Sequence, residues 1–376
     1  MRAMAAGLRN AGLTVDQWVL DTPRQVLDKS ENTAYPGSLY FGKLDTRIKP
    51  FAALKNFLFS GKSYNIERFE SLELASDIAN LIKKNGYAIV QAESIFALAL
   101  IAPILHEIEV PVILRAHNVE HLIWERMAGS SSNPFVSFYL RVMSKRLKKD
   151  ELELLHRVDG LIAISNTDLD LLRSLGYSKK AVVSGIPALR IVNAHEIPPT
   201  NADHIFHLGS MDWLPNLEGV QWFVDEVWLK LTQVFPSLKC SLAGKAMPDS
   251  IRNKAAGNLL VEQAPDAAEF MLSRGIMIVP LLSGGGIRAK IIEGLALGRV
   301  ILTTSIGAEG IPIKDKEHLF ICNTADDFVA TLAYLKQHPE AIDQVSKNAC
   351  TFANENFSLH KITQPVLDLY NELTHP

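Results

Sequence analysis

Short apolar runs alternate along the chain with longer segments of helical periodicity. The runs are continuously hydrophobic, which is typical of strands that are buried on both faces of a parallel sheet. Repeated strand–helix units of this kind predict the α/β class. The expected strands are Val15–Leu20, Ala88–Gln91, Pro111–Ala116, Gly160–Ile164, Ala181–Val183, His204–Leu208, Lys239–Leu242, Asn258–Val261, Ile276–Pro280, Arg299–Thr303 and His318–Ile321.

The repetition breaks once, at Gly185–His204, where three prolines and a polar run interrupt it. The break predicts a linker between two α/β domains of similar size. We expect one domain at 1–190, a second at 191–358 and a final helix at 359–376, and the pattern leaves open which domain that helix packs against.

The chain opens with an expected helix at Arg2–Gly12. Domains of this class normally open with a strand and a loop. We therefore expect the given sequence to begin late, without that strand and its glycine loop. A fold that truly begins with a helix is the alternative.

Composition narrows the class of protein. The 376 residues agree with two or three domains of roughly 150 residues each, and the formal net charge of −3 argues against a nucleic-acid partner. The three cysteines lie far apart, which argues against a disulfide framework or a structural zinc site and favours a cytoplasmic location. The longest strongly apolar run, Ser94–Leu105, is shorter than the roughly 20 residues that a membrane-spanning helix needs.

The most informative segment is Ile276–Gly298, a buried strand, a glycine-rich turn and a helix that Gly298 closes. Gly284, Gly285 and Gly286 let backbone N–H groups approach a ligand closely, and the start of the following helix adds a positive dipole end. Together these features predict an anion site for a diphosphate or a carboxylate.

Charged side chains follow the turn. Arg288, expected in the first helical turn, offers a fork suited to phosphate oxygens, and Lys290 and Glu293 are expected on one helix face. A carboxylate at that position can accept both hydroxyls of a ribose, so a nucleotide fits in outline. A plain glycine-rich turn with solvated cations is the alternative. The segment matches neither the P-loop nor the usual dinucleotide-binding fingerprint.

The motif Gly284-x-Gly-x-Arg-x-Lys-x-x-Glu-x-x-Ala-x-Gly, followed by Val300-x-x-Thr-x-x-x-Gly-Ala-Glu-Gly, resembles the donor-site region of the group 1 (family 4) glycosyltransferases. The resemblance is closest to the bacterial branch that assembles polysaccharides and exopolysaccharides. It implies the GT-B fold, with two Rossmann-like domains that face a cleft. Further segments carry the resemblance through most of the chain: Asn56–Asn65, Leu114–Glu120, Gly160–Asn166 and Phe206–Asn216.

The resemblance also implies roles for residues on the donor side. Glu293 matches the second glutamate of the family's Glu-x7-Glu motif, which binds the ribose, whereas the first glutamate falls at Gly285 and is missing. We expect the backbone amides of Gly284–Ile287 to replace it.

Two cations of the family are missing as well, because their positions are Ser210 and Asn216. Arg288 and Lys290 are the candidates to replace them at the diphosphate. Gly209, beside the missing pair, is expected to line the donor site. Glu309 is expected either to contact the donor or only to cap a turn.

In the N-terminal half, His117 follows a buried run, and the resemblance implies that it lies near the transferred sugar. A histidine at the edge of the core is the alternative. Asn118 and Glu120 are expected on the acceptor side, although a Glu120–Arg115 ion pair is the simpler explanation for Glu120. Glu93, at the end of another expected strand, is similarly placed.

The implied activity is a retaining transfer of a sugar from a UDP- or GDP-sugar to a hydroxyl of a glycan or lipid-linked acceptor. We expect no metal and no cofactor, because positive side chains would stabilise the departing diphosphate. The alternative is an inactive or truncated GT-B protein that binds a nucleotide or scaffolds a glycan-assembly complex.

A basic stretch raises the question of membrane contact. Five cations interleave with apolar residues within nine positions, and acidic residues follow at once. A solvated helix face is one interpretation, and a peripheral contact with an anionic membrane surface, on its cytoplasmic side, is the other. The cations are Arg141, Lys145, Arg146, Lys148 and Lys149.

Overall fold

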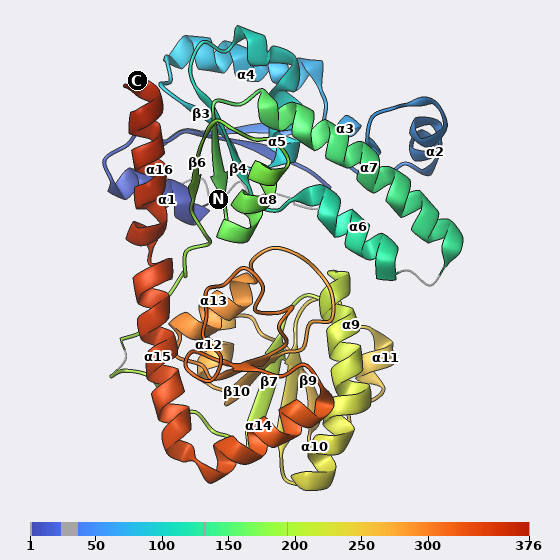
Figure 1. Cartoon of the computed structure of the whole chain (residues 1–376), viewed down its shortest axis with the longest axis vertical. Coiled ribbons are helices and arrows are strands. Elements are labelled where there is room, and N and C mark those ends of the chain that lie inside the picture. Colours follow the sequence, from blue (N-terminus) through green and yellow to red (C-terminus); the bar gives the residue numbers. More distant parts are fainter. Residues whose placement is uncertain (1, 24–36, 131–132, 194, 376) are drawn as a thin grey trace. The chain divides into compact units, whose positions relative to one another are not determined.

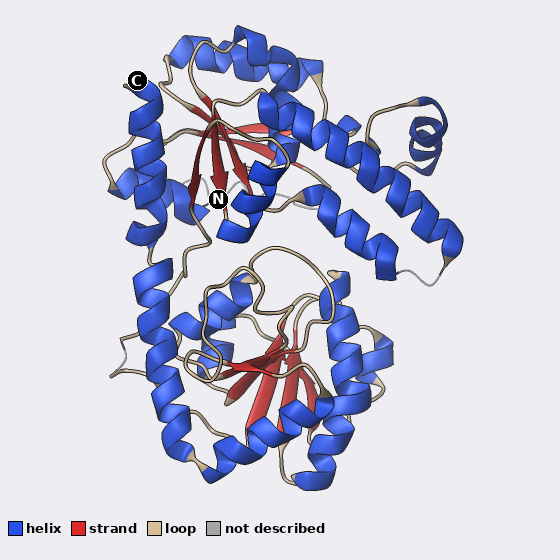
Figure 2. Ribbon diagram, viewed as in Figure 1, coloured by secondary structure: helices blue, strands red, loops and turns tan. Residues whose placement is uncertain are grey.

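The computed structural model describes residues 2–23, 37–130, 133–193 and 195–375. The chain forms two compact units: Met1–Ser184 with Thr363–Pro376, and Gly185–Ile362. In each unit parallel strands form a sheet that helices flank (Figure 1, Figure 2).

The first unit contains a four-stranded parallel sheet in the order β3-β4-β5-β6 and a separate parallel pair, β1-β2. The strands are β1 (Gln17–Asp21), β2 (Leu39–Lys43), β3 (Val90–Ala92), β4 (Val112–Ala116), β5 (Gly160–Ala163) and β6 (Lys180–Val183). The helices are α1 (Arg2–Asn10), α2 (Pro50–Phe59), α3 (Tyr64–Glu67), α4 (Leu72–Asn85), α5 (Ile95–Ile101), the 3₁₀ helix Ala102–Glu107, α6 (Glu120–Ser130), α7 (Pro134–His156), α8 (Asn166–Ser174) and most of α16 (Leu359–Thr374).

The second unit holds one six-stranded parallel sheet in the order β12-β11-β10-β7-β8-β9. Its strands are β7 (His204–Leu208), β8 (Lys239–Ala243), β9 (Leu259–Glu262), β10 (Ile276–Val279), β11 (Ile301–Thr303) and β12 (Phe320–Ile321). Its helices are α9 (Leu214–Trp222), the π-helical Phe223–Val227, α10 (Trp228–Val234), α11 (Asp249–Arg252), α12 (Ala267–Leu272), α13 (Ala289–Ala296), α14 (Ala325–Gln337) and α15 (Pro339–Phe357).

The strand order of the second unit decides where a ligand can bind. Counted from β7 as the first strand, the order is that of a Rossmann sheet, with the reversal between β7 and β10. Ligands of open α/β sheets bind outside the carboxyl ends of the strands at this point, where the two flanking loops diverge.

All the expected strands form, with ends that shift by at most two residues. The pattern missed β2, whose residues are only half-buried along most of its length. It also began β11 two residues early, because Arg299 lies before the strand. The fully buried guanidinium of Arg299 donates to the carbonyls of Pro198, Arg274 and Leu297.

The final helix, α16, packs on the first unit beyond Ile362, which answers a question that the sequence pattern left open. Tyr370 Oη donates to Gln91 Oε1 at 2.6 Å, and Lys180 Nζ donates to the carbonyl of Glu372. A Cβ on Gly160 would lie 2.9 Å from the Leu373 side chain, so the small residue in β5 permits this close approach.

Candidate functional site

A group of polar side chains lies at the strand-order reversal of the second unit. Gly209 follows β7, and Lys290 lies in the first turn of α13, which follows β10 and its glycine-rich turn. Lys290 Nζ donates to Asn216 Oδ1 at 2.7 Å, and Asn216 Nδ2 donates to the carbonyl of Ser210 at 2.8 Å. The lysine therefore reaches the loop after β7, where the sequence lacks the two cations of the family.

Gly209 leaves the space that Lys290 uses. A Cβ at this position would lie 2.4 Å from Lys290 Nζ and 2.9 Å from Asn216 Nδ2. Burial, with the nearby charge of Arg288, lowers the pKa of Lys290 to about 7. Among the residues that the structure describes, no carboxylate lies within ion-pair distance of this amine. A cation without an acidic partner at this point of the sheet is suited to an anionic ligand.

The sequence analysis missed His207, which lies two residues before Gly209. Its Nδ1 is 3.0 Å from the carbonyl of Ile278, and burial holds its pKa well below the usual value, so the ring is neutral. Nδ1–H therefore donates and Nε2 carries the lone pair. This Nε2 is buried and has no hydrogen-bond partner within the described part of the chain. The only sequence signal was a histidine between two apolar residues of a strand.

Arg288 lies one position earlier than expected, at the start of α13. It is the N-cap residue of α13 and not part of the first turn, and its side chain is buried. Its Nη1 donates to the carbonyls of Gly285 and Gly286, and its guanidinium lies 5.5 Å from the ring centre of Trp213. The guanidinium therefore stabilises the turn, and its expected role at the diphosphate stays a prediction.

The glycine-rich turn requires two of its glycines. Gly284 has φ +110° and Gly286 has φ +75°, conformations that side chains with a Cβ rarely adopt. Glu309 Oε2 lies 4.0 Å from Arg288 Nη2, so Glu309 lies beside the same turn. The structure thus places Gly284, Gly285, Gly286, Arg288 and Glu309 together.

Glu293 lies elsewhere on α13. Its Oε1 accepts the backbone N–H of Leu189 at 3.0 Å, whereas Lys290 contacts Asn216, so the two side chains have different partners. Burial raises the pKa of Glu293. The carboxylate is engaged with the 185–199 segment of its own unit, and a ribose role for it remains a prediction.

In the first unit, His117 belongs to a charged network at the carboxyl ends of β3 and β4. Glu93 Oε2 lies 2.8 Å from His117 Nε2 and 3.2 Å from Arg115 Nη1, and Gln91 Nε2 donates to Glu93 Oε1 at 2.6 Å. Burial opposes the charge on Glu93, but the bond to His117 and the charge of Arg115 lower its pKa to about 2. Glu93 is therefore ionised and orients the half-buried imidazole.

Glu120 contacts its neighbour Asn118. Asn118 Nδ2 donates to Glu120 Oε1 at 3.3 Å, and Arg115 forms an ion pair with Glu93. Burial, reinforced by the nearby charge of Glu151, raises the pKa of Glu120 to about 7. Asn118 and Glu120 thus contact each other next to His117 in sequence, and their acceptor role stays a prediction.

The sequence contains one Asp-x-Asp motif, Asp168–Asp170, which lies in α8. Ser165 Oγ donates to Asp168 Oδ2 as part of the cap of this helix. Across the described ranges, no three His, Cys, Asp or Glu side chains gather as a metal site requires. Within the same ranges no helix is long and apolar enough to cross a membrane.

Comparison with known families gives consistent matches for both units. Residues 1–184 match the family described as "Glycosyltransferase Family 4", and residues 202–338 match the one described as "Glycosyl transferases group 1". The chain is 23% identical over 260 residues to an "Uncharacterized 44.6 kDa protein in cps region" of Klebsiella pneumoniae. This match covers 66% of the chain and 66% of the relative.

Solved structures share the fold over nearly the whole chain. A glycosyltransferase from Rickettsia africae matches with TM-score 0.67 and 17% identity, over 100% of this chain and 94% of the other. Anabaena Alr3699/HepE in complex with UDP matches with TM-score 0.70 and 12% identity, over 99% and 95%. Sucrose-phosphate synthase from Thermosynechococcus elongatus matches with TM-score 0.69 and 13% identity, over 99% and 92%. At these identities the likeness establishes only the fold, which is GT-B with two Rossmann-like domains.

Proposed function

Since the chain belongs to the group 1 (family 4) glycosyltransferases, we propose that it is a retaining enzyme that moves a sugar from a UDP- or GDP-sugar to an acceptor hydroxyl. The acceptor is a glycan or a lipid-linked saccharide, and the product belongs to a cell-associated polysaccharide. The relative named for a cps region supports the polysaccharide assignment. The neighbour named as a complex with UDP-glucose supports the donor class.

One observation carries the proposal: Lys290, a cation with no acidic partner among the described residues, lies where the Rossmann sheet reverses its strand order. A diphosphate at this point would lie against the Lys290 ammonium, the backbone amides of Gly284–Gly286 and the start of α13. These groups would stabilise the negative charge that develops on the leaving diphosphate.

The proposed reaction needs no protein nucleophile. The bond between the anomeric carbon and the diphosphate oxygen breaks, and the acceptor oxygen bonds to the same face of that carbon. The acceptor proton moves to the departing diphosphate. His117 would hydrogen-bond to a sugar hydroxyl while Glu93 holds its ring, Asn118 and Glu120 would contact the acceptor, and Glu293 would accept the ribose hydroxyls.

Calorimetric titration with UDP, GDP and ADP, first without metal and then with Mg²⁺, tests the donor assignment. We expect one nucleotide to bind saturably without metal. Lys290→Met should lose this binding, and Lys239→Met, at the exposed start of β8, is the matched control. Absence of binding to all three nucleotides would overturn the proposal and favour a scaffolding protein. The anomeric configuration of the product, read by proton NMR, then tests retention.

We also propose a cytoplasmic enzyme that works at the inner face of the membrane. The exposed basic residues of α7, Arg141, Lys145, Lys148 and Lys149, support this placement. Their charge is suited to anionic headgroups, which concentrate on cytoplasmic leaflets.

A further inference from the structure

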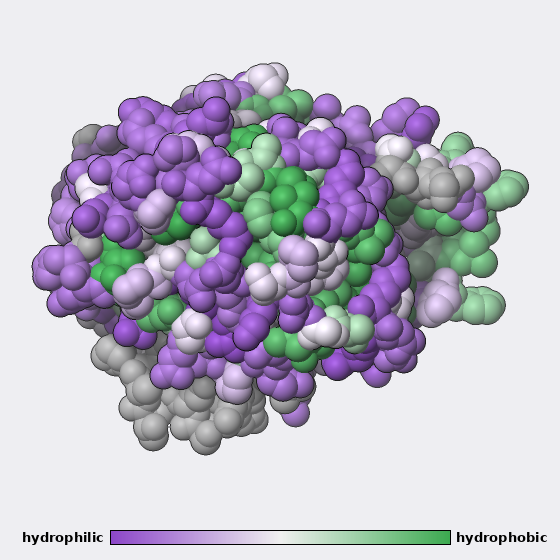
Figure 3. All heavy atoms as spheres, turned by 90° about the horizontal axis from the view of Figure 1, so that it is seen from below, coloured by the Kyte–Doolittle hydropathy of each residue, from purple (hydrophilic) through white to green (hydrophobic). Residues whose placement is uncertain are grey.

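Helix α2 and the first turns of α7 expose an unusual concentration of large apolar side chains. Phe51, Phe59, Phe135 and Phe138 are 89%, 82%, 84% and 64% exposed. Helices of water-soluble domains normally turn such side chains toward the core. Further exposed apolar residues lie on the same two segments or just before α2: Ile48, Leu54, Leu58 and Val136. Green, hydrophobic atoms accordingly gather at the right-hand edge of Figure 3.

Helix α2 buries a polar residue and exposes apolar ones, which is the reverse of a normal amphipathic helix. Its one fully buried residue is Asn56. Asn56 Nδ2 donates to the carbonyl of Lys62 at 3.1 Å and to Glu67 Oε2 at 2.6 Å. From α7, Arg146 donates to the carbonyls of Asn56 and Phe57 at 3.2 and 2.9 Å. Polar contacts thus fix the helix, and most of its apolar side chains remain outside.

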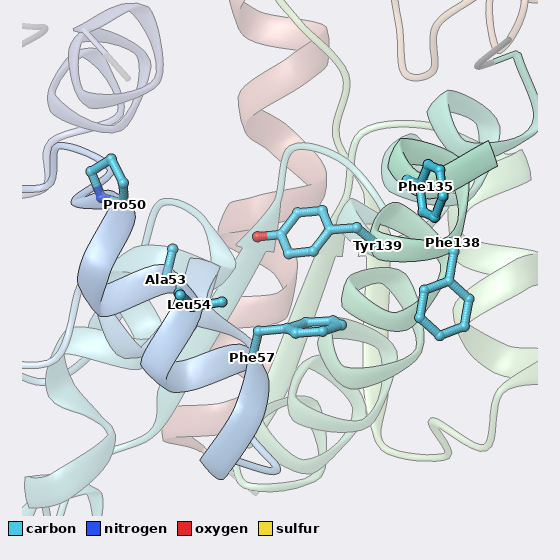
Figure 4. A pocket seen from close by; sticks show the side chains of 7 residues that line it. All are labelled: Pro50, Ala53, Leu54, Phe57, Phe135, Phe138 and Tyr139. Atoms are coloured by element: carbon cyan, nitrogen blue, oxygen red, sulfur yellow. The ribbon is translucent and has the colours of Figure 1, made fainter. Parts of the chain in front are cut away.

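Between the two helices lies an apolar groove (Figure 4). The Phe57 and Tyr139 rings meet there with centres 5.3 Å apart, and the Arg146 guanidinium lies 5.5 Å from the Phe57 ring centre. The groove is open and joins the exposed aromatic surface, because Phe135 and Phe138 belong to both. Its lining residues are Pro50, Ala53, Leu54, Phe57, Phe135, Phe138 and Tyr139.

The two stretches that form this surface carry an excess of positive charge, although Asp45 pairs with Arg47 and Lys49, and Glu70 pairs with Lys62, at the edge of the first stretch. Neither Thr46–Ile66 nor Met127–Lys149 contains an aspartate or a glutamate, and together the two stretches carry nine lysines and arginines. The whole chain, by contrast, has a formal net charge of −3. The exposed face of α7 passes from Phe135 and Phe138 to Arg141, Lys145 and Lys148, so apolar and basic groups follow one another along the helix.

We propose that α2 and the first half of α7 form a docking surface for an anionic phospholipid bilayer, with the phenylalanines inserted among the acyl chains and the basic residues at the phosphates. An apolar layer beside a phosphate layer is the chemistry of a bilayer surface, and interfacial helices combine these same residue types. A second copy of the chain fits less well, because it would bring two basic surfaces together. The inference deepens the membrane placement proposed above, on which it rests, and does not depend on the sugar transfer.

Flotation of the purified chain with vesicles tests the surface. We expect binding to vesicles of phosphatidylcholine with phosphatidylglycerol, and weak binding to phosphatidylcholine alone. The triple variant Phe51→Ser, Phe59→Ser and Phe135→Ser should lower the partition coefficient about tenfold or more. The matched control, Leu72→Ser with Leu229→Ser, removes exposed apolar side chains elsewhere and should bind as the unchanged chain does.

A second comparison isolates the charges. Replacing Arg141, Lys145 and Lys148 with glutamine should remove the preference for anionic vesicles, whereas Lys347→Gln with Lys361→Gln should retain it. Nucleotide binding should survive in all these variants, so a failure of docking is distinguishable from a failure of the proposed transfer.

The proposal would be overturned if the unchanged chain failed to bind anionic vesicles, or if the phenylalanine variant bound them equally well. If vesicle binding is absent and light scattering shows a concentration-dependent dimer that the phenylalanine variant abolishes, the surface belongs to a second copy of the chain.

Discussion

Raising the pH should weaken the binding of a nucleotide sugar through one group, Lys290. Its pKa is lowered from 10.5 to about 7 by burial, and a bound diphosphate would raise it again by supplying the missing negative charge. Binding then requires a protonated Lys290. At pH 6.5 most of the free protein already carries that proton, and at pH 8.5 only about 3% does. The affinity should therefore fall about 25-fold over this range, or about 2 kcal/mol.

Calorimetry with UDP-glucose or GDP-mannose measures this loss, because the diphosphate diester of a nucleotide sugar keeps its charge throughout the range. At pH 8 the complex should take up about 0.9 proton, which is visible as a dependence of the observed heat on the buffer's ionisation enthalpy. Lys290→Arg should bind with little pH dependence, because a guanidinium stays charged.

The pH dependence of the free energy of unfolding gives an independent check. A lysine whose pKa is lower in the folded state destabilises the fold at low pH, and this loss of stability disappears as the pH rises from about 7 to 10.5. Lys290→Met should accordingly raise Tm at pH 6.5 while it weakens nucleotide binding. Affinity for the nucleotide sugar that stays constant between pH 6.5 and 8.5, with no proton uptake, would refute the placement of the diphosphate at Lys290.

Four other substitutions test the remaining site residues. Glu293→Ala should weaken nucleotide binding by about 1–3 kcal/mol, and unchanged affinity in a folded variant would remove Glu293 from the site. His117→Ala should spare nucleotide binding and lower the transfer rate, whereas loss of folding would favour a core role for this histidine. Glu93→Gln should destabilise the fold by up to about 3 kcal/mol above pH 4.5, a difference that vanishes as the pH falls through about 2 in acid-unfolding curves. Gly209→Ala should displace the Lys290 ammonium and reduce affinity for the donor with little change in Tm, and normal affinity would show that the amine does not need this position.

The local pattern of the sequence was sufficient for all the strands of both units except β2. Continuous apolar runs such as Ile276–Pro280 predict strands buried on two faces, because a polar residue on either face would meet a helix. Half-burial alone does not explain why β2 was missed, because β1 is half-buried along its whole length and was predicted. The glycines of the turn after β10 were likewise readable, since only glycine adopts the positive φ of Gly284 and Gly286 at little cost.

What each charged side chain contacts depended on the tertiary structure. Arg288 and Lys290 are two residues apart, yet the first donates to the carbonyls of its own turn and the second reaches Asn216, 74 positions earlier in the chain. Glu93 and His117 come from two strands and meet because parallel strands end at the same edge of a sheet.

For the apolar surface of α2, too, the sequence determined the composition and the tertiary structure determined the direction of the side chains. The sequence by itself determined that the segment is apolar and free of acidic residues, a composition that fits a buried helix equally well. Only the tertiary structure decided that Asn56 faces inward and the phenylalanines outward, because the partners of Asn56 and of the helix's last carbonyls, Glu67 and Arg146, lie on other elements. Local periodicity sets which residues form an element, whereas long-range hydrogen bonds and charges set the direction in which its side chains point.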